Sequence, residues 1–279
     1  MRVKQSGPIG VFDSGVGGLT VLRALQQQLP QESFLYLGDT ARVPYGTRTK
    51  AEIIQFGQEI IAWMLTQRVK MVVMACNTSS ALALDELRQV FPMPVLGLIL
   101  PGARAALRQG DRIGVIATPA TVQSQAYPRA IREVNPQAQV WQVSCPEFVP
   151  LIEQNQIHAP ETVAIVAEYL ERLLAHDINT LVYGCTHYPH LAPIIERLLP
   201  PTVRCIDPAW AVSQAARQEL QVLGLGCRGR QYGQTRFGVT GEPAQFTQVA
   251  QQWLTATVKT EKVYLSPAPL TPGLLNSVD

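Results

Sequence analysis

Two segments of the chain share one design, and their likeness constrains the fold more than any other feature. Each is a short apolar stretch that ends at a small residue, presents a cysteine and continues into a polar helix start; they are Met71–Ser80 and Leu181–His190. A strand-to-helix turn of this kind places a side chain at the carboxyl end of a sheet, where open α/β folds bind ligands. A single cysteine there is usually inert packing. Two cysteines in matching settings, Cys76 and Cys185, indicate a role in catalysis.

Strand-like and helix-like segments alternate along most of the chain. Ile9–Phe12 is a predicted strand, Leu19–Gln28 has helical spacing, and Val95–Ile99 is another predicted strand. Thr49 and Glu52 have the spacing of a capping box at a helix start. From about residue 257 the sequence has no clear period. This alternation predicts an α/β fold with mainly parallel sheets and helices on both faces.

The second half of the chain begins as a repeat of the first. Ile113–Ile116 matches Ile9–Phe12 at an offset of 104 residues, and the two cysteines lie 109 residues apart. Together with a length of 279 residues, this duplication predicts two similar α/β domains. We expect residues 1–98 plus 210–279 to form the first domain and residues 99–209 the second. A pseudo-two-fold axis would then bring the cysteine-bearing strand ends together at the domain interface, a preferred place for small-molecule sites.

Charge and hydropathy exclude several classes of partner. The net charge is +2 and only 16% of residues are charged, so neither a nucleic-acid footprint nor a polybasic membrane patch is expected. The first apolar run is interrupted by Asp13, which argues against a signal peptide. No apolar stretch approaches the roughly 18 residues of a membrane span. A cytoplasmic protein without nucleic-acid or membrane partners is therefore expected.

The five cysteines do not form a recognisable metal or disulfide pattern. No two of them are spaced as C-x-x-C, and their number is odd. We therefore expect reduced thiols and no metal site. Cys145, Cys205 and Cys227 lie in no matched motif and are expected to be packing residues.

The glycine-containing loop Asp13–Gly18 invites comparison with nucleotide-binding loops and fails in detail. Gly15 and Gly17 fit the G-x-G-x-x-G pattern, but its last position is Thr20, and the loop has no lysine for a P-loop. We expect a tight turn that requires positive φ. Its amides could hold a carboxylate at the start of the following helix.

Two thiols on opposite sides of one small substrate suit inversion at a C–H centre. One thiolate removes a proton while the other thiol supplies one to the opposite face, which is the reaction of a racemase or epimerase. A free thiol has a pKa of about 8.5, so the base needs activation. Both cysteines lie where a helix is expected to begin, which lowers a thiol pKa, and His187 follows Cys185 closely. Asp13 could assist Cys76.

Four segments also carry a resemblance to a known family. They are Gly10–Leu19, Gly38–Gly46, Ala75–Thr78 and Gly184–Pro189. In this order they resemble the glutamate racemases of the aspartate/glutamate racemase superfamily. The resemblance implies interconversion of L- and D-glutamate without cofactor or metal, to supply D-glutamate for peptidoglycan. We also expect a homodimer.

The resemblance assigns roles to individual residues. It implies that Cys76 and Cys185 are the acid/base residues, Cys76 for the D-enantiomer and Cys185 for the L-enantiomer. Asp13 and His187 are implied to assist them, with Glu153 as an auxiliary acid. The implied substrate-binding pairs are Asp13–Ser14, Tyr45–Gly46, Asn77–Thr78 and Thr186–His187.

Two residues depart from the family pattern. Glu147 is an acid where the family generally has an apolar residue, although the spacing favours Glu153 as the site acid. Pro128 falls in a segment that the family usually keeps helical. Two alternatives stay open: an aspartate or other amino-acid racemase of the same superfamily, and a non-catalytic protein that binds an amino acid or phosphate through the Asp13–Gly18 loop.

Overall fold

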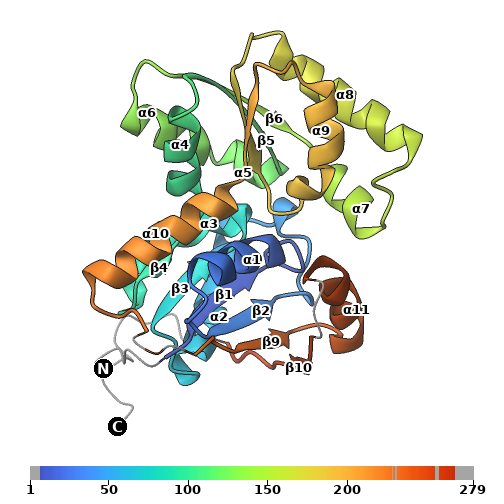
Figure 1. Cartoon of the computed structure of the whole chain (residues 1–279). Coiled ribbons are helices and arrows are strands. Elements are labelled where there is room, and N and C mark those ends of the chain that lie inside the picture. The colour runs from blue at the N-terminus through green and yellow to red at the C-terminus, as the bar shows by residue number, and fades with distance from the viewer. Residues whose placement is uncertain (1–6, 228, 230, 255–257, 268–279) are drawn as a thin grey trace.

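The computed structural model describes residues 7–227, 229, 231–254 and 258–267, and it has the expected α/β architecture. Two bodies lie one above the other in Figure 1, each built around one sheet with helices on both faces. Every strand pairing among the described residues is parallel. The predicted fold class is therefore confirmed.

The larger sheet has six strands in the order β10-β9-β2-β1-β3-β4. Its central strands come from the start of the chain and its outer pair from the end, so the C-terminal segment returns to the first body. The strands are β1 (Ile9–Asp13), β2 (Phe34–Gly38), β3 (Met71–Met74), β4 (Val95–Leu96), β9 (Thr235–Val239) and β10 (Thr260–Lys262).

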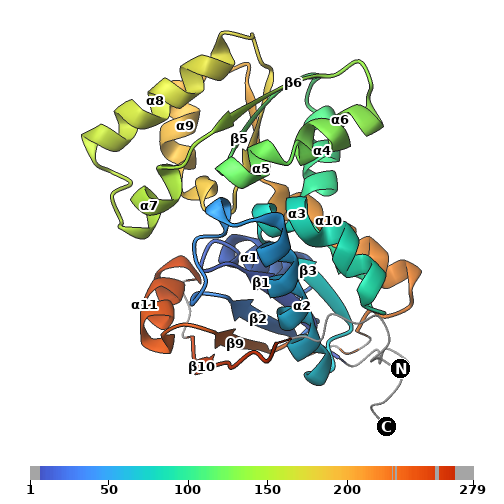
Figure 2. The same ribbon diagram turned by 180° about the vertical axis from the view of Figure 1, so that it is seen from behind.

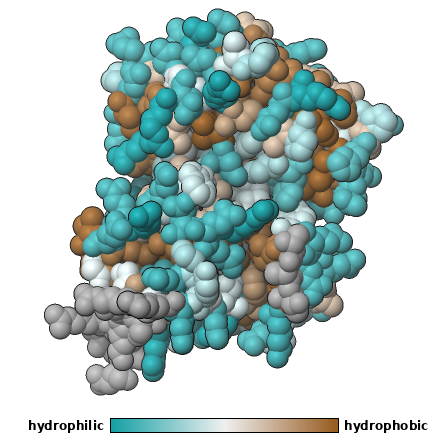
Figure 3. Space-filling view, viewed as in Figure 1, coloured by the Kyte–Doolittle hydropathy of each residue, from teal (hydrophilic) through white to brown (hydrophobic). Residues whose placement is uncertain are grey.

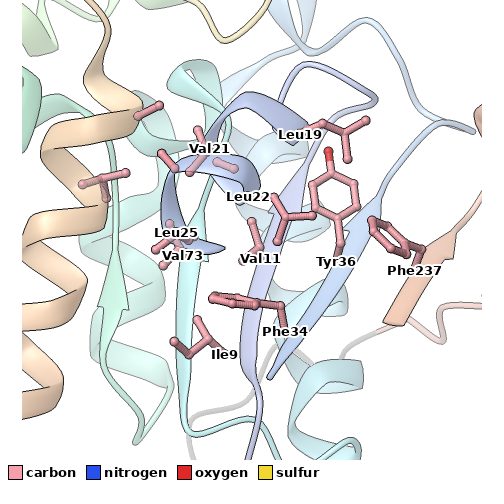
Figure 4. Packing of buried hydrophobic residues seen from close by; sticks show 14 of the residues in the cluster. Ile9, Val11, Leu19, Val21, Leu22, Leu25, Phe34, Tyr36, Val73 and Phe237 are labelled. Carbon is pink, nitrogen blue, oxygen red and sulfur yellow. The ribbon is translucent and has the colours of Figure 1, made fainter. Parts of the chain in front are cut away.

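Alternate residues of these strands pack on opposite faces, as the two-residue period of a strand requires. On one face Ile9, Val11 and Tyr36 meet Leu22 and Leu25, in the cluster shown in Figure 4. That face is covered by α1 (Leu19–Gln28), α10 (Pro208–Val222) and α11 (Pro243–Leu254). The other face is covered by α2 (Lys50–Thr66) and α3 (Asn77–Val90), which are in front in Figure 2.

The smaller sheet has four strands in the order β6-β5-β7-β8. They are β5 (Arg112–Ala117), β6 (Gln139–Ser144), β7 (Thr180–Gly184) and β8 (Arg204–Ile206). One face is covered by α4 (Ile99–Leu107) and α6 (Ala126–Val134), and the other by α7 (Phe148–Glu153), α8 (Pro160–Leu174) and α9 (Ala192–Leu198). The short elements η1 (Tyr45–Thr47), α5 (Pro119–Gln123) and η2 (Tyr188–Leu191) lie in the connections.

The strand order repeats between the two sheets. The order β2-β1-β3-β4 in the first is matched by β6-β5-β7-β8 in the second. The duplication inferred from the sequence is therefore present in the topology, with β1 equivalent to β5 and β3 to β7. The helix α10 packs on both α1 and α4 and so joins the two bodies.

Several local predictions need correction. The strand expected at Val95–Ile99 has two residues, because α4 already begins at Ile99. Pro128 is the third residue of α6, in the first turn, where a missing N–H costs no helical hydrogen bond. The aperiodic C-terminal stretch contains β10, an edge strand with two exposed residues out of three. The capping box at Thr49 and Glu52 is present as predicted.

The surface is mostly polar on the face seen in Figure 3, with apolar side chains in separate patches. Large exposed apolar side chains include Val222 and Leu223 at the end of α10 and Trp210 near its start. Among the residues that the structure describes, no helix combines the length and the apolar character needed to cross a bilayer.

Candidate active site

The polar strand ends of both sheets meet where the two bodies touch. Asp13 is the last residue of β1, Cys76 follows β3, and Cys185 directly follows β7. All three are buried. The Thr186 hydroxyl donates a 3.4 Å hydrogen bond to Asp13 Oδ2, which joins the second body to the first at this point. The two matched cysteine motifs therefore contribute to one polar cluster.

The glycines of the Asp13–Gly18 loop serve close packing. A Cβ on Gly17 would lie 2.5 Å from Nδ1 of His187, and one on Gly18 would lie 2.5 Å from Cβ of Asp13. The expectation of positive φ in this loop is wrong, because among the described glycines only Gly224 has such a φ. The loop needs glycine because side chains from both bodies press against its backbone.

Cys76 lies in an environment that favours the neutral thiol. It is the N-cap residue of α3, and its carbonyl accepts hydrogen bonds from the Ser80 amide at 2.9 Å and the Ser79 hydroxyl at 3.1 Å. Burial, followed by the negative charges of Asp13 and Cys185, raises the pKa of the Cys76 thiol to about 12. The expected lowering of this pKa at a helix start is therefore outweighed.

Asp13 is completely buried beside Cys76. Its Oδ1 accepts a 2.9 Å hydrogen bond from the Gly15 amide. Burial raises the pKa of this carboxyl, while the positive charge of His187 and the loop amides oppose the rise. Asp13 consequently interacts electrostatically with both cysteine sides of the site.

Cys185 faces an imidazole. Its sulfur lies 3.8 Å from Nδ1 of His187, and Nε2 of the same ring lies 3.1 Å from Oε1 of Glu153. Burial alone would lower the His187 pKa, but the contacts with Cys185 and Glu153 and the charge of Asp13 raise it to about 10. His187 is therefore an imidazolium at neutral pH, held between a sulfur and a carboxylate.

The backbone after Cys185 differs from the expectation of a helix that begins at the cysteine. The next element is the 3₁₀ helix η2, which starts at Tyr188 and has His187 as its N-cap residue. The α-helix α9 begins only at Ala192. The field of a helix dipole is felt only near the first turn. The positive charge close to the Cys185 sulfur therefore comes from His187 rather than from a helix N-terminus.

The structure separates the two acids of the α7 region. Glu153, the last residue of α7, reaches His187, and 35% of its side chain is exposed. Glu147 instead accepts a hydrogen bond from the Tyr169 hydroxyl of α8. The geometry therefore agrees with the choice of Glu153 over Glu147 as the acid next to the site.

The expected substrate-binding residues are gathered at the same junction and are buried, with Gly46 half-buried; they are Ser14, Tyr45, Gly46, Asn77, Thr78 and Thr186. Tyr45 donates its hydroxyl to Asp39, which also accepts hydrogen bonds at 2.7 Å from Arg42 Nε and the Thr240 hydroxyl. This buried carboxylate holds the start of the 3₁₀ helix η1 in place. A Cβ on Gly46 would lie 3.1 Å from Cβ of Thr118 in the other body.

Two further threonines join the site. The Thr78 hydroxyl lies 2.9 Å from that of Thr118 and 3.3 Å from that of Thr121, and the latter two lie 3.0 Å apart. Sequence reasoning missed Thr118 and Thr121 as site residues. A signal was present, because the offset of 104 residues makes Thr118 the counterpart of Ser14.

His190, in the short helix η2, packs against an aromatic ring. The His190 ring lies 3.7 Å from the Trp253 ring between centroids and is half-buried, and the burial lowers its pKa to about 4, with the charge of His187 adding to the effect. Trp253, in α11, packs against the cores of both bodies. The remaining cysteines also divide: Cys145 is buried as expected, whereas Cys227 is exposed and does not serve packing.

No group of three or more histidine, cysteine or acidic side chains is placed to hold a metal ion in the described part of the chain. The side chains gathered at the candidate site are thiols, hydroxyls, carboxyls, an amide and an imidazole. These are groups that transfer protons and bind carboxylates.

The duplicated sheet and the polar strand ends between its two copies define an α/β enzyme of the amino-acid racemase class. The chain belongs to the Asp/Glu/Hydantoin racemase family, whose model matches residues 9–216. It is 60% identical to a glutamate racemase of Rippkaea orientalis, over 99% of this chain and 97% of that relative. The resemblance noted from the motifs is thus confirmed.

Solved structures agree with this assignment. The chain matches glutamate racemase isoform RacE1 from Bacillus anthracis with a TM-score of 0.90 and 36% identity, covering 94% of this chain and 98% of that one. It matches the Francisella tularensis glutamate racemase in complex with D-glutamate with a TM-score of 0.87 and 35% identity, covering 93% and 98%.

Proposed function

We propose that the protein interconverts L- and D-glutamate by a two-base mechanism without cofactor or metal. The observation that carries this proposal is the equivalent placement of Cys76 and Cys185 after β3 and β7 of the repeated sheet. The identity of the substrate is inferred from the relatives named above, which are glutamate racemases at up to 60% identity over nearly the whole chain.

In the L-to-D direction Cys185 is the base and Cys76 is the acid. The Cys185 thiolate removes the α-proton, and the electron pair of the broken C–H bond stays on carbon. The Cys76 thiol then delivers its proton to the opposite face. The turnover leaves Cys185 protonated and Cys76 as the thiolate, which is the form that acts on D-glutamate.

The neighbours of each cysteine support these roles. Cys185 must release its proton to act as a base, and the neighbouring His187 can accept that proton. With a pKa of about 10, His187 keeps it at neutral pH. Cys76, with a pKa raised to about 12, retains its own proton until the substrate accepts it. In the reverse direction Cys76 must lose that proton, and the buried carboxyl of Asp13 is the nearby acid-base group that can exchange it.

The substrate has a carboxylate at each end of its carbon chain, and these groups need fixed hydrogen-bond donors. The Thr78 and Thr186 hydroxyls and the Asn77 amide lie at the junction of the two bodies. Such groups hold carboxylates and stabilise a carbanion adjacent to one without an electron-accepting cofactor. Because these side chains are buried, we propose that the two bodies separate to admit glutamate and then close around it.

An isotope experiment tests the mechanism. The purified protein should racemise glutamate with EDTA present and no pyridoxal phosphate added. In D₂O, the product of early turnover should be almost fully deuterated at Cα from either enantiomer, because the donating thiol carries solvent deuterium. Substantial retention of protium would indicate a single shared base, and a requirement for pyridoxal phosphate or a divalent metal would contradict the proposal. Faster turnover of aspartate than glutamate would favour the aspartate alternative.

The cellular role belongs to the same proposal. We propose a cytoplasmic homodimer that supplies D-glutamate for peptidoglycan, with domains formed by residues 1–98 plus 210–279 and by residues 99–209. Growth of a D-glutamate auxotroph on expression of the chain would support the role. Light scattering after size-exclusion chromatography would determine the oligomeric state.

A further inference from the structure

Of the two polar atoms in the side-chain amide of Asn77, one has a hydrogen-bond partner among the described residues and the other has none. It is the first residue of α3, directly after Cys76, and it is only 2% exposed. Its Oδ1 accepts a hydrogen bond, whereas Nδ2 is buried and finds no partner among the described residues. Leaving a buried amide N–H₂ unpaired is costly, so its position at the site calls for an acceptor supplied by a ligand.

The group bonded to Asn77 comes from the other body of the molecule. The Tyr127 hydroxyl, on α6, donates to Asn77 Oδ1 at 2.7 Å, and Tyr127 is fully buried. Its surroundings leave it little freedom: a Cβ on Gly102 of α4 would lie 3.3 Å from the Tyr127 hydroxyl and 3.1 Å from Pro208 Cγ. The hydroxyl is thus held at a fixed place against the amide.

The direction of this hydrogen bond sets the orientation of the amide. Burial raises the pKa of Tyr127, and the charges of Asp207 and Cys185 raise it further, so the hydroxyl keeps its proton. A protonated hydroxyl can donate, and in the structure it donates to the oxygen of Asn77, so Tyr127 does not engage the amide nitrogen. The Asn77 N–H₂ group is then directed away from Tyr127.

We propose that Tyr127 is a positioning residue that orients the Asn77 amide so that Nδ2 donates to a carboxylate of the bound amino acid. This inference rests on the proposed function and extends it to a residue outside the family motifs. Because the bond joins α6 to α3, the donor is oriented when the two bodies are together. Closure of the site therefore also brings the Asn77 amide into the orientation that binds the carboxylate.

The test is Tyr127→Phe, which removes the hydroxyl and keeps the ring. A carboxylate contact made equally in the bound state and the transition state affects KM rather than kcat. We expect KM to rise roughly fivefold to tenfold for both enantiomers, with kcat changed by less than about twofold. Tyr169→Phe is the matched control, since it removes another hydroxyl bonded to a side chain, Glu147, and should leave KM unchanged.

A double-mutant cycle separates positioning from general packing. In an Asn77→Ala background, Tyr127→Phe should have almost no further effect on KM, because the group that it orients is absent. An undiminished effect in that background, or a wild-type KM for Tyr127→Phe alone, would overturn the inference. If Tyr127→Phe does not fold, an unchanged KM for Asn77→Ala would overturn it equally.

The wild-type protein distinguishes this inference from the proposed function. Absence of glutamate racemisation by the wild type would contradict both the proposed function and the role of Tyr127. Normal wild-type turnover with an additive cycle would remove only the role of Tyr127.

Discussion

The Cys76 and Cys185 strand ends are equivalent in the repeated sheet, yet their surroundings are electrostatically opposite. Cys76 lies near the Asp13 carboxyl, and its pKa is raised to about 12. Cys185 lies 3.8 Å from His187, whose own pKa is raised to about 10. One thiol is placed beside an anion and the other beside a cation.

This difference shows how a duplicated fold can support a reaction that needs two unlike groups. The repeat supplies the same backbone position twice, after β3 and after β7. The second copy adds His187 and Glu153, and the first adds Asp13 from the neighbouring strand β1. In the proposed mechanism one cysteine starts as the base and the other as the acid, and the neighbours determine which is which.

The largest expected effect comes from removing either cysteine. Cys76→Ala and Cys185→Ala should each lower racemisation by roughly 10³-fold or more, because the net reaction needs both an acid and a base. Cys227→Ser, at an exposed position, is the control and should retain full activity. Turnover numbers for both enantiomers measure the effect. Near-normal activity of either alanine variant would remove that cysteine from the mechanism.

The second prediction concerns the two assisting groups. Asp13→Asn and His187→Asn should each lower kcat by on the order of 10²-fold in the direction that begins at the cysteine they assist, and less in the other. The equilibrium constant between enantiomers is about one, so kcat/KM must fall equally in both directions. Steady-state kinetics from each enantiomer would reveal the asymmetry. Equal kcat losses in both directions for both variants would show that the two sides are not independent.

A smaller effect should follow from Glu153→Gln. The carboxylate beside Nε2 helps to raise the His187 pKa, so its loss should bring that pKa down from about 10. The imidazolium would then lose its proton at lower pH, so the alkaline limb of the pH–activity profile should shift to lower pH. Activity at neutral pH should fall by at most about tenfold. NMR titration of the His187 ring measures the pKa directly.

Glu147→Gln is the matched control for that experiment. Glu147 lies just before the same helix but is bonded to Tyr169, so the His187 titration should stay unchanged. Equal shifts in both variants would mean that overall charge, rather than the Glu153 contact, determines the His187 pKa.

The sequence predicted well those features that depend on local pattern. Short apolar runs that end at Asp13, Cys76 and Cys185 could be recognised as strand ends, and parallel strands bring such ends to one edge of a sheet. It failed where tertiary contacts decide. The edge strand β10 has no apolar alternation and is defined by its pairing with β9.

The site shows the same division. Gly17 was expected to serve backbone conformation, but the structure assigns it to the close approach of His187, which is 170 residues away in the chain. The bond from Tyr127 to Asn77 and the contact of Thr78 with Thr118 also join distant segments. No periodicity encodes such pairs, although the repeat offset places Thr118 opposite Ser14.

The smallest expected effect is on stability, and it tests the charge of the Cys185 side without catalysis. His187 has its pKa raised from 6.5 to about 10 in the folded protein. A group with a raised folded-state pKa contributes stability that is fully present below its unfolded pKa and is lost as pH rises through its folded pKa. Wild type should therefore exceed His187→Asn in melting temperature by the most near pH 6, by on the order of a few degrees, and the gap should narrow toward pH 10. The exposed His158→Asn variant should follow the wild-type curve at every pH. A gap that stays constant from pH 6 to 10 would show that His187 stabilises by packing alone, and the contrast drawn between the two cysteine sides would lose its electrostatic basis.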